Sequence, residues 1–576
     1  MKGSAKNNPK ATSFARRSTA LAVAACTTTL LAGLNAHAED SGREADKEDG
    51  GRHELQFLLP GNLVVSRSVY DNKASNVKVG TVLPPNCAAT TGGCSAATGA
   101  PFDGTYPEVW NNDTYDASFG ITSKILLDQV TPFGLYLGSM EVPNSLQAGV
   151  GPSNDQMVTS FSSKSELALN LSLDGRFLTF AGYVAPVDTV DVSNSNTPDA
   201  VDPTNPVGQN YLRAVARVDA RGNFHFTETN AYSGNNGRAA ILNNVDGADA
   251  IYTAGNAGNG ANPQPDGVVL GAGAQIFTPS LLAERFQAPV TPTPVASFSV
   301  TELGAKADKI GKDDNFRGMT VYNNVLYYTK GSGSNGVNTV YFVDTTGSAC
   351  PKGTGVPVSG APLPTAALTY DPAALQSAGL PSNMCVLAGF PAIPNKSQTT
   401  ITAFPFGIWF ADANTVYVAD EGDGYTGGTD LYTHAAAQTT AGLQKWVFDS
   451  SSGQWHLAYT LQTGLGLGVP YSVKGYPSGT NATTGLPWSP ATDGLRNITG
   501  AVDEHGVVTI WAITSTVSGN GDTGADPNHL VVIADFKDNT DPKLAAKEQF
   551  FTLRSAQSGE VLRGVSFTPG TELHRH

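Results

Sequence analysis

The chain has 576 residues, and its 50 Asp and Glu outnumber its 35 Lys and Arg, for a formal net charge of −15 at pH 7. A negative charge of this size disfavours nucleic acids and anionic membrane surfaces as partners. After the N-terminal leader there is no uninterrupted apolar run of about 18 residues, so the composition also disfavours a membrane span.

Residues 1–38 have the parts of a secretory signal peptide. Basic residues come first, an apolar run follows from Ala20 to Leu34, and Ala36-His37-Ala38 gives a small-residue cleavage pattern. We therefore expect a secreted protein, extracellular or periplasmic, that starts with a charged, disordered lead over residues 39–52. The leader leaves the general and the twin-arginine export routes open, and a lipid anchor at Cys26 is the weaker alternative.

The rest of the chain reads as one all-β domain. It contains 63 Gly and 35 Pro, few long helical patterns and many short apolar runs, which is typical of strands joined by turns. We expect a single domain over residues 53–571 and a short tail over 572–576. Long insertions are expected at about 71–119, 187–209 and 345–383.

Two ends of the sequence supply complementary parts of one repeat. The segments "GNLVVSRSV" (61–69), "ITSKILLDQV" (121–130) and "LYLGSMEVP" (135–143) read as second, third and fourth strands. The segment "VLRGVSFTPG" (561–570) reads as an isolated first strand. If both ends share one blade, a propeller ring closes and leaves no open sheet edge.

Five complete four-strand units lie between these ends. In the clearest one, "FGIWFADANTVYVADEGD" gives two strands and "LQKWVFDSSSGQWHLAYTLQ" gives two more. Together with the shared unit they predict a six-bladed β-propeller of four-stranded antiparallel blades. Seven blades is the alternative, if a long insertion hides one. The complete units begin at Leu167, Arg238, Arg317, Phe406 and Arg496.

Four cysteines remain after the leader, which in an exported chain suggests two disulfides. We expect Cys87 to pair with Cys94 and Cys350 with Cys385, because each pair lies within one insertion. Zinc is the weaker alternative, since no histidine stands near either pair at ligand spacing.

The strand-and-turn segment "VYVAD" (416–420), followed by "LQKWVFD" (443–449), resembles the signature of NHL-repeat propellers, in which a hydrophobic strand ends in Asp. The resemblance covers one blade and implies the architecture. Six-bladed relatives, such as the senescence-marker-like lactonases and paraoxonase-like hydrolases, hold calcium at the channel mouth. In the other blades the Asp is replaced by Lys330, Gly255, Gly182, Thr514 and Arg67.

Cations recur where the first strands enter the channel. Because guanidinium groups suit carboxylate and phosphate, their convergence predicts an anion-binding funnel. The alternative is that arginines pair with the acids three residues earlier, namely Asp314, Asp493 and Glu560. The predicted ligand-binding cations are Arg238, Arg317, Arg496 and Arg563 at the strand entrances, with Arg67 and Lys330 at the ends of second strands.

Two acidic loops offer hard oxygen ligands for calcium. One contains Asp191 and Asp199, and the other contains Asp420, Glu421 and Asp423. Neither has the spacing of an EF-hand, and the alternative is a solvated turn whose side chains bond their own backbone.

Sequence motifs for a catalytic nucleophile or a phosphate-cradling loop are absent. His529, at the start of a third strand, is the best candidate for a general base. We expect a monomer that binds an anionic or carbohydrate ligand at the channel mouth, with lactonase-like or esterase-like hydrolysis or polysaccharide elimination as the activity. A non-catalytic extracellular or cell-surface propeller is the competing class.

Overall fold

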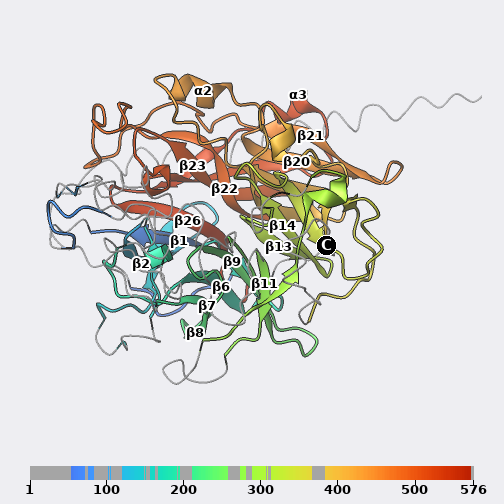
Figure 1. Cartoon of the computed structure of the whole chain (residues 1–576), viewed down its shortest axis with the longest axis horizontal. Helices are drawn as coiled ribbons and strands as arrows, with labels where there is room; N and C mark the ends of the chain where they lie inside the picture. The colour runs from blue at the N-terminus through green and yellow to red at the C-terminus, as the bar shows by residue number, and fades with distance from the viewer. Residues whose placement is uncertain are drawn as a thin grey trace, which may run out of the picture. The chain divides into compact units, whose positions relative to one another are not determined.

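The computed structural model describes residues 54–71, 76–83, 101–102, 104, 120–147, 150, 156–161, 167–190, 192–194, 211–256, 273–280, 289–306, 308, 313–365 and 383–572. Six antiparallel β-sheets follow one another in a ring (Figure 1). The six-bladed propeller expected from the repeats is confirmed, and the seven-bladed alternative is wrong. Within the described residues no helix is long and apolar enough to cross a membrane.

We number the blades 1 to 6 around the ring and give each blade's strands from the centre outward. Blade 1 contains β26 (Glu560–Phe567), β1 (Leu63–Val69), β2 (Thr122–Val130) and β3 (Tyr136–Glu141), with the short β4 (Thr159–Ser160) paired to β2. Blade 2 contains β5 (Asn170–Leu171), β6 (Phe177–Tyr183), β7 (Arg213–Asp219) and β8 (Phe224–Thr229). Blade 3 contains β9 (Gly237–Asn243), β10 (Ala250–Gly255), β11 (Ala274–Phe277) and β12 (Thr293–Ala296).

The second half of the ring is more regular. Blade 4 contains β13 (Met319–Tyr322), β14 (Val325–Lys330), β15 (Thr339–Val343) and β17 (Met384–Leu387), and β16 (Thr354–Gly355) adds a parallel edge. Blade 5 contains β18 (Pro405–Asp412), β19 (Thr415–Asp420), β20 (Gly442–Asp449) and β21 (Gln454–Leu461). Blade 6 contains β22 (Ala491–Val502), β23 (Val507–Val517), β24 (His529–Phe536) and β25 (Phe551–Ser555).

Helical segments are short and lie in the connections. The helix α2 (Leu431–Ala437) follows β19, and α3 (Pro542–Ala545) follows β24. The 3-10 turns are η5 (Val192–Asn194), η7 (Val300–Leu303), η9 (Asn395–Ser397) and η10 (Thr523–Ala525).

The shared blade closes the ring as the sequence predicts. Strand β26 pairs antiparallel with β1, so that Leu63 faces Phe567 and Val65 faces Val565. First strands of neighbouring blades contact one another all the way round, in the order β26, β5, β9, β13, β18, β22 and back to β26. The channel is therefore lined by six first strands, and their entrances share one mouth.

Apolar side chains pack mainly between blades, because alternate residues of each strand face the neighbouring sheet. Blades 1 and 2 enclose one such cluster around Ile125 and Phe180. Blades 4 and 5 enclose another, in which Tyr327 and Phe410 pack with Trp446. The interfaces between blades therefore hold the apolar core.

One of the two predicted disulfides lies within the described residues. Cys350 and Cys385 are bonded, with their Cα atoms 5.7 Å apart. Cys385 belongs to β17, so the bond ties the insertion after β15 to a strand of the ring rather than closing the insertion on itself. Cys87 and Cys94 lie outside the described residues.

Candidate functional site

The positions at which arginines recur lie at equivalent places of the first strands around the ring, as the sequence predicts. In three blades the residue after this position is glycine, because the backbone of the adjacent blade comes too close for a side chain. Asn497 takes this place in blade 6 and donates to the carbonyl oxygen of Arg563 at 2.7 Å. A Cβ would lie 2.1 Å from the Phe406 carbonyl oxygen at Gly318, 2.4 Å from that of Arg496 at Gly407, and 2.3 Å from that of Leu167 at Gly564.

Two arginines converge on one carboxylate at the mouth. Arg496 donates from Nε to Oε2 of Glu421 at 3.2 Å, and Arg317 Nε lies 3.8 Å from Oε1 of the same side chain. Both guanidinium groups lie beside the ring of Phe406, at 5.9 and 6.0 Å from its centre. Their side chains are 8% and 11% exposed and that of Glu421 is 11% exposed, so only a small part of this bracket meets water.

Charge balance in this bracket is tight. Burial lowers the pKa of Arg317 and the nearby Arg496 lowers it further, whereas Glu421 raises it. Within the bracket, one carboxylate faces two guanidinium groups. Glu421, from the loop after β19 in blade 5, therefore serves arginines of blades 4 and 6 at once.

Arg238 and Arg563, the other two predicted arginines at the strand entrances, contact groups outside this bracket. Arg238 donates from Nη1 to the carbonyl oxygen of Phe316 at 2.7 Å and to the side chain of Asn315. Arg563 donates to the carbonyl oxygen of Phe161. These two guanidinium groups thus support backbone at the mouth, and whether they also meet a ligand stays a prediction.

Arg67 and Lys330 lie in polar clusters of their own. Arg67 bonds Asp128 at 2.7 Å and also Glu560, and its pKa is raised by Asp128 although burial alone would lower it. Lys330 is buried and donates to the Ser332 carbonyl oxygen at 2.6 Å. Burial lowers the pKa of Lys330 to about 7.

The acidic partners differ from those that the alternative prediction named. Glu421, and not an acid three residues earlier, pairs with Arg317 and Arg496, while Glu560 bonds Arg67. Residues three apart in an extended strand point to opposite faces, which separates Glu560 from Arg563 on β26. The pairs therefore form between strands and between blades, where sequence spacing gives no signal.

The predicted calcium loop directs its three acids apart. Asp420 is buried and accepts hydrogen bonds from the backbone N–H groups of Phe404 at 2.8 Å and Gly422 at 3.0 Å. Asp423 instead faces His434 at 2.6 Å. No group of three or more His, Cys, Asp or Glu in the described part of the chain could hold a metal ion. Calcium here stays a prediction without support from this geometry, and Asp191 and Asp199 lie outside the described residues.

Asp493, in β22 of blade 6, contacts this loop, although the sequence suggested it as a partner of Arg496. Its carboxylate accepts from the Gly424 N–H at 2.9 Å and from the Gln438 side chain at 2.5 Å. Burial raises the pKa of Asp493 to about 7 and that of Asp420 to about 8. Gly422, at φ +78°, must be glycine because a Cβ would lie 2.4 Å from Asp493 Oδ2.

His529 begins β24 as predicted, but its contacts lie in blade 6 and its rim. Nδ1 lies 3.0 Å from the Ser555 hydroxyl, and the ring packs against Tyr471 with centres 4.5 Å apart. Burial lowers the pKa of His529 to about 4, so the imidazole is neutral at pH 7. A neutral ring is suited to a base, but these contacts do not place it beside the Arg317–Arg496 pair, and its catalytic role stays a prediction.

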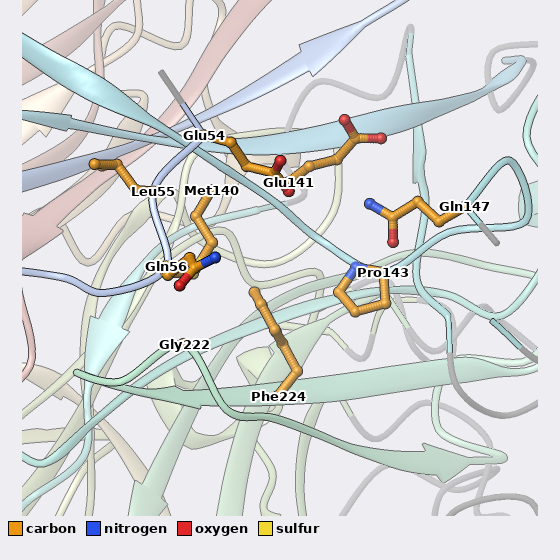
Figure 2. Close-up of a pocket in the computed structure, with 9 residues that line it drawn as sticks. All are labelled: Glu54, Leu55, Gln56, Met140, Glu141, Pro143, Gln147, Gly222 and Phe224. Carbon is orange, nitrogen blue, oxygen red and sulfur yellow. The ribbon is translucent and has the colours of Figure 1, made fainter. Parts of the chain in front are cut away.

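A separate pocket of about 480 Å³ opens between the outer strands of blades 1 and 2. Figure 2 shows the carboxylates of Glu54 and Glu141 on one side and Phe224 on the other. Among the described residues no arginine lines this pocket, and the pocket lies on other strands than those that form the mouth. Its lining is completed by Leu55, Gln56, Met140, Pro143, Gln147 and Gly222.

Comparison with known proteins does not identify a family. No family model matches this sequence, and no curated protein matches it. Among solved structures, NanB plus Optactamide aligns at 8% identity and a TM-score of 0.31, over 71% of this chain and 62% of that one. An ACO/RPE65 chimera aligns at 9% identity and a TM-score of 0.29, over 91% and 96% of the two chains. This chain thus spans less than two thirds of the NanB chain, and likeness at these TM-scores carries no argument about chemistry.

Proposed function

We propose that the protein is an exported propeller that binds a small carboxylate-bearing ligand, such as an acidic saccharide, at the channel mouth. The supporting observation is the bracket in which Arg317, just before the first strand of blade 4, and Arg496, in the first strand of blade 6, meet the carboxylate of Glu421. Two guanidinium groups aimed at one carboxylate form the kind of donor set that selects carboxylates over neutral ligands.

Glu421 can leave the bracket without disturbing the fold around it. Its backbone N–H donates to the Phe404 carbonyl oxygen at 3.0 Å, and its own carbonyl oxygen accepts from the Ser515 hydroxyl at 2.6 Å. The main chain is thus held while the side chain can rotate outward. In this proposal the side chain of Glu421 covers the two arginines until a ligand carboxylate takes its place.

Titration calorimetry with galacturonate, and with galactose as the uncharged comparison, tests the proposal. Arg496→Ala should weaken uronate binding about ten- to a hundredfold, because a hydrogen bond to a charged group contributes roughly 1.5–3 kcal/mol. Glu421→Gln should strengthen binding, since the internal competitor loses its charge. Arg176→Ala is the matched control, because this arginine is 72% exposed and pairs only locally with Asp174.

A second outcome would favour a structural bracket instead. If Arg496→Ala leaves binding intact and lowers the free energy of unfolding by about 3–5 kcal/mol, the pair is a buried ion pair whose loss strands Glu421. Equal affinity for galacturonate in Glu421→Gln and the unaltered protein would also contradict the proposal.

A non-catalytic interaction propeller is the second candidate, and the turn between β2 and β3 favours it. Phe133 and Leu135 are 59% and 66% exposed there, and Tyr136 beside them is 40% exposed. Neighbouring exposed apolar side chains are typical of contact surfaces. If every variant at the mouth binds galacturonate as tightly as the unaltered protein does, this exposed apolar surface becomes the preferred binding site.

A further inference from the structure

A buried ion pair connects the third strands of blades 5 and 6. Lys445 on β20 places Nζ 3.1 Å from Oδ2 of Asp535 on β24, and both side chains are 0% exposed. Figure 1 shows α3 beside β20 and β21 in this region, and α3 contacts β21. An amine and a carboxylate are thus held together out of water.

The carboxylate of Asp535 is fixed by two phenols. Tyr417 donates to Oδ2 at 2.5 Å, and Tyr459 lies 2.8 and 2.9 Å from the two carboxylate oxygens. The rings of Tyr417 and Tyr459 also flank Lys445, with Nζ 5.7 and 5.3 Å from their centres. These aromatic walls exclude water and hold the carboxyl carbon in a defined orientation.

The amine is held just as firmly. Nζ donates to the carbonyl oxygens of Phe536 at 2.6 Å and Asn539 at 2.8 Å, and to the Tyr459 hydroxyl at 3.0 Å. Burial lowers the pKa of Lys445, although Asp535 raises it. The lysine is therefore closer to its neutral, nucleophilic form than a lysine in water.

A third group supplies an acid. Glu548, between α3 and β25, hydrogen-bonds Asp535, and burial together with that neighbouring carboxylate raises the pKa of Glu548 to about 9. Glu548 therefore carries a proton at pH 7. Among the described residues its Oε2 atom is buried without a hydrogen-bond partner.

We propose that Lys445 and Asp535 join in an intramolecular isopeptide bond, with Glu548 as the acid that assists. A proton passes from the Lys445 ammonium to the Asp535 carboxylate, the amine so formed attacks Cγ of the Asp535 carboxyl group, and a C–N bond forms. Glu548 gives its proton to the departing carboxyl oxygen and takes one from the attacking nitrogen. The C–O bond breaks and one water leaves, so the products are an amide, a water and an unchanged Glu548, and no oxidant or cofactor is required.

The geometry supplies what a carboxyl and an amine lack in solution. Cγ is at most about 1.2 Å farther from Nζ than Oδ2 is, because that is the length of the carbon–oxygen bond. Groups held near attack distance react with effective concentrations far above those in solution. The protonated neighbour turns the departing oxygen into water, which a buried carboxylate alone cannot do.

Peptide mass mapping of the unaltered, reduced protein tests this directly. Trypsin cuts after Lys396, Lys474, Arg496 and Lys537, but it does not cut after an acylated Lys445. We expect the peptides 397–474 and 497–537 to appear joined, with a mass one water below their sum. Separate peptides with normal cleavage after Lys445 would overturn the proposal.

Two controls separate the bond from ordinary ion pairing. Lys396 lies 2.5 Å from Asp308 but is 50% exposed, so the peptides that contain these two residues should stay separate. Glu548→Gln keeps the shape and removes the acid, and it should abolish the joined peptide and lower the melting temperature. A joined peptide in Glu548→Gln would overturn the role of Glu548, and the map of the unaltered chain remains decisive if that variant does not fold.

Discussion

Individual carboxyl groups near the mouth accept hydrogen bonds from backbone N–H groups, and yet their pKa values are raised. Asp420 and Asp493 each accept from the acidic loop's own main chain, and burial raises the pKa of both. A raised pKa means that the folded protein binds more protons than the unfolded chain. The free energy of unfolding therefore falls as the pH rises from the ordinary carboxyl pKa to the raised one.

Asp493→Asn should remove part of this pH dependence. The pKa of Asp493 rises from 3.8 to about 7, so the unaltered protein should lose stability over this interval while the variant does not. Between pH 4 and pH 7, the free energy of unfolding of the unaltered protein should fall by roughly 2–4 kcal/mol more than that of the variant. Urea titrations at several pH values measure this, and parallel profiles for the two proteins would contradict it.

First strands are the elements that set the mouth, and their spacing rests on small residues. Gly564 in β26 faces the backbone of blade 2, where a Cβ would lie 2.3 Å from the Leu167 carbonyl oxygen. Sequence predicted this register from arginines at equivalent positions. It could not predict the partner of those arginines, because Glu421 comes from the neighbouring blade and its spacing from Arg317 and Arg496 follows no local rule.

Gly564→Ala should destabilise the ring by about 1–3 kcal/mol or more, because the added methyl meets backbone that cannot move independently. Gly453→Ala in the β20–β21 turn is the comparison. A Cβ there meets nothing within 4 Å, and its cost comes only from φ +67°. Chemical denaturation measures both variants, and equal losses would show that the close contact between blades 1 and 2 is not limiting.

At the scale of the whole molecule, sequence was sufficient for the blade count and the closure, because four-strand units repeat regardless of loop length. It was insufficient for the bonds between blades. Lys445 and Asp535 belong to different repeats, and nothing in either strand marks the other as its partner. The disulfide between Cys350 and Cys385 could be predicted from the sequence, because a chain with few cysteines allows few pairings.

Closure makes the last strand as important as any other. A chain ending at Gly559 should lose its cooperative thermal transition, because β26 carries Leu562, Val565 and Phe567, which are 1–5% exposed in the core between blades 6 and 1. Each such side chain contributes roughly 1.5–3 kcal/mol through burial. A chain ending at Glu572 is the control for truncation itself. Scanning calorimetry distinguishes the two, and an unchanged transition in the shorter chain would contradict the closure.

The pairing of β26 with β1 also constrains the order in which the blades can fold and the ring can close. Blade 1 receives its innermost strand from residues 560–567, which a ribosome makes after all the strands of blades 2 to 6. Blades 2 to 6 can form as they emerge, but the ring stays open, with β1 unpaired on its inner side, until residues 560–567 have been made. A contact between strands so far apart in the sequence makes the final step slow. During that interval the edge of β1 is exposed to other chains, so yield during refolding should depend on protein concentration.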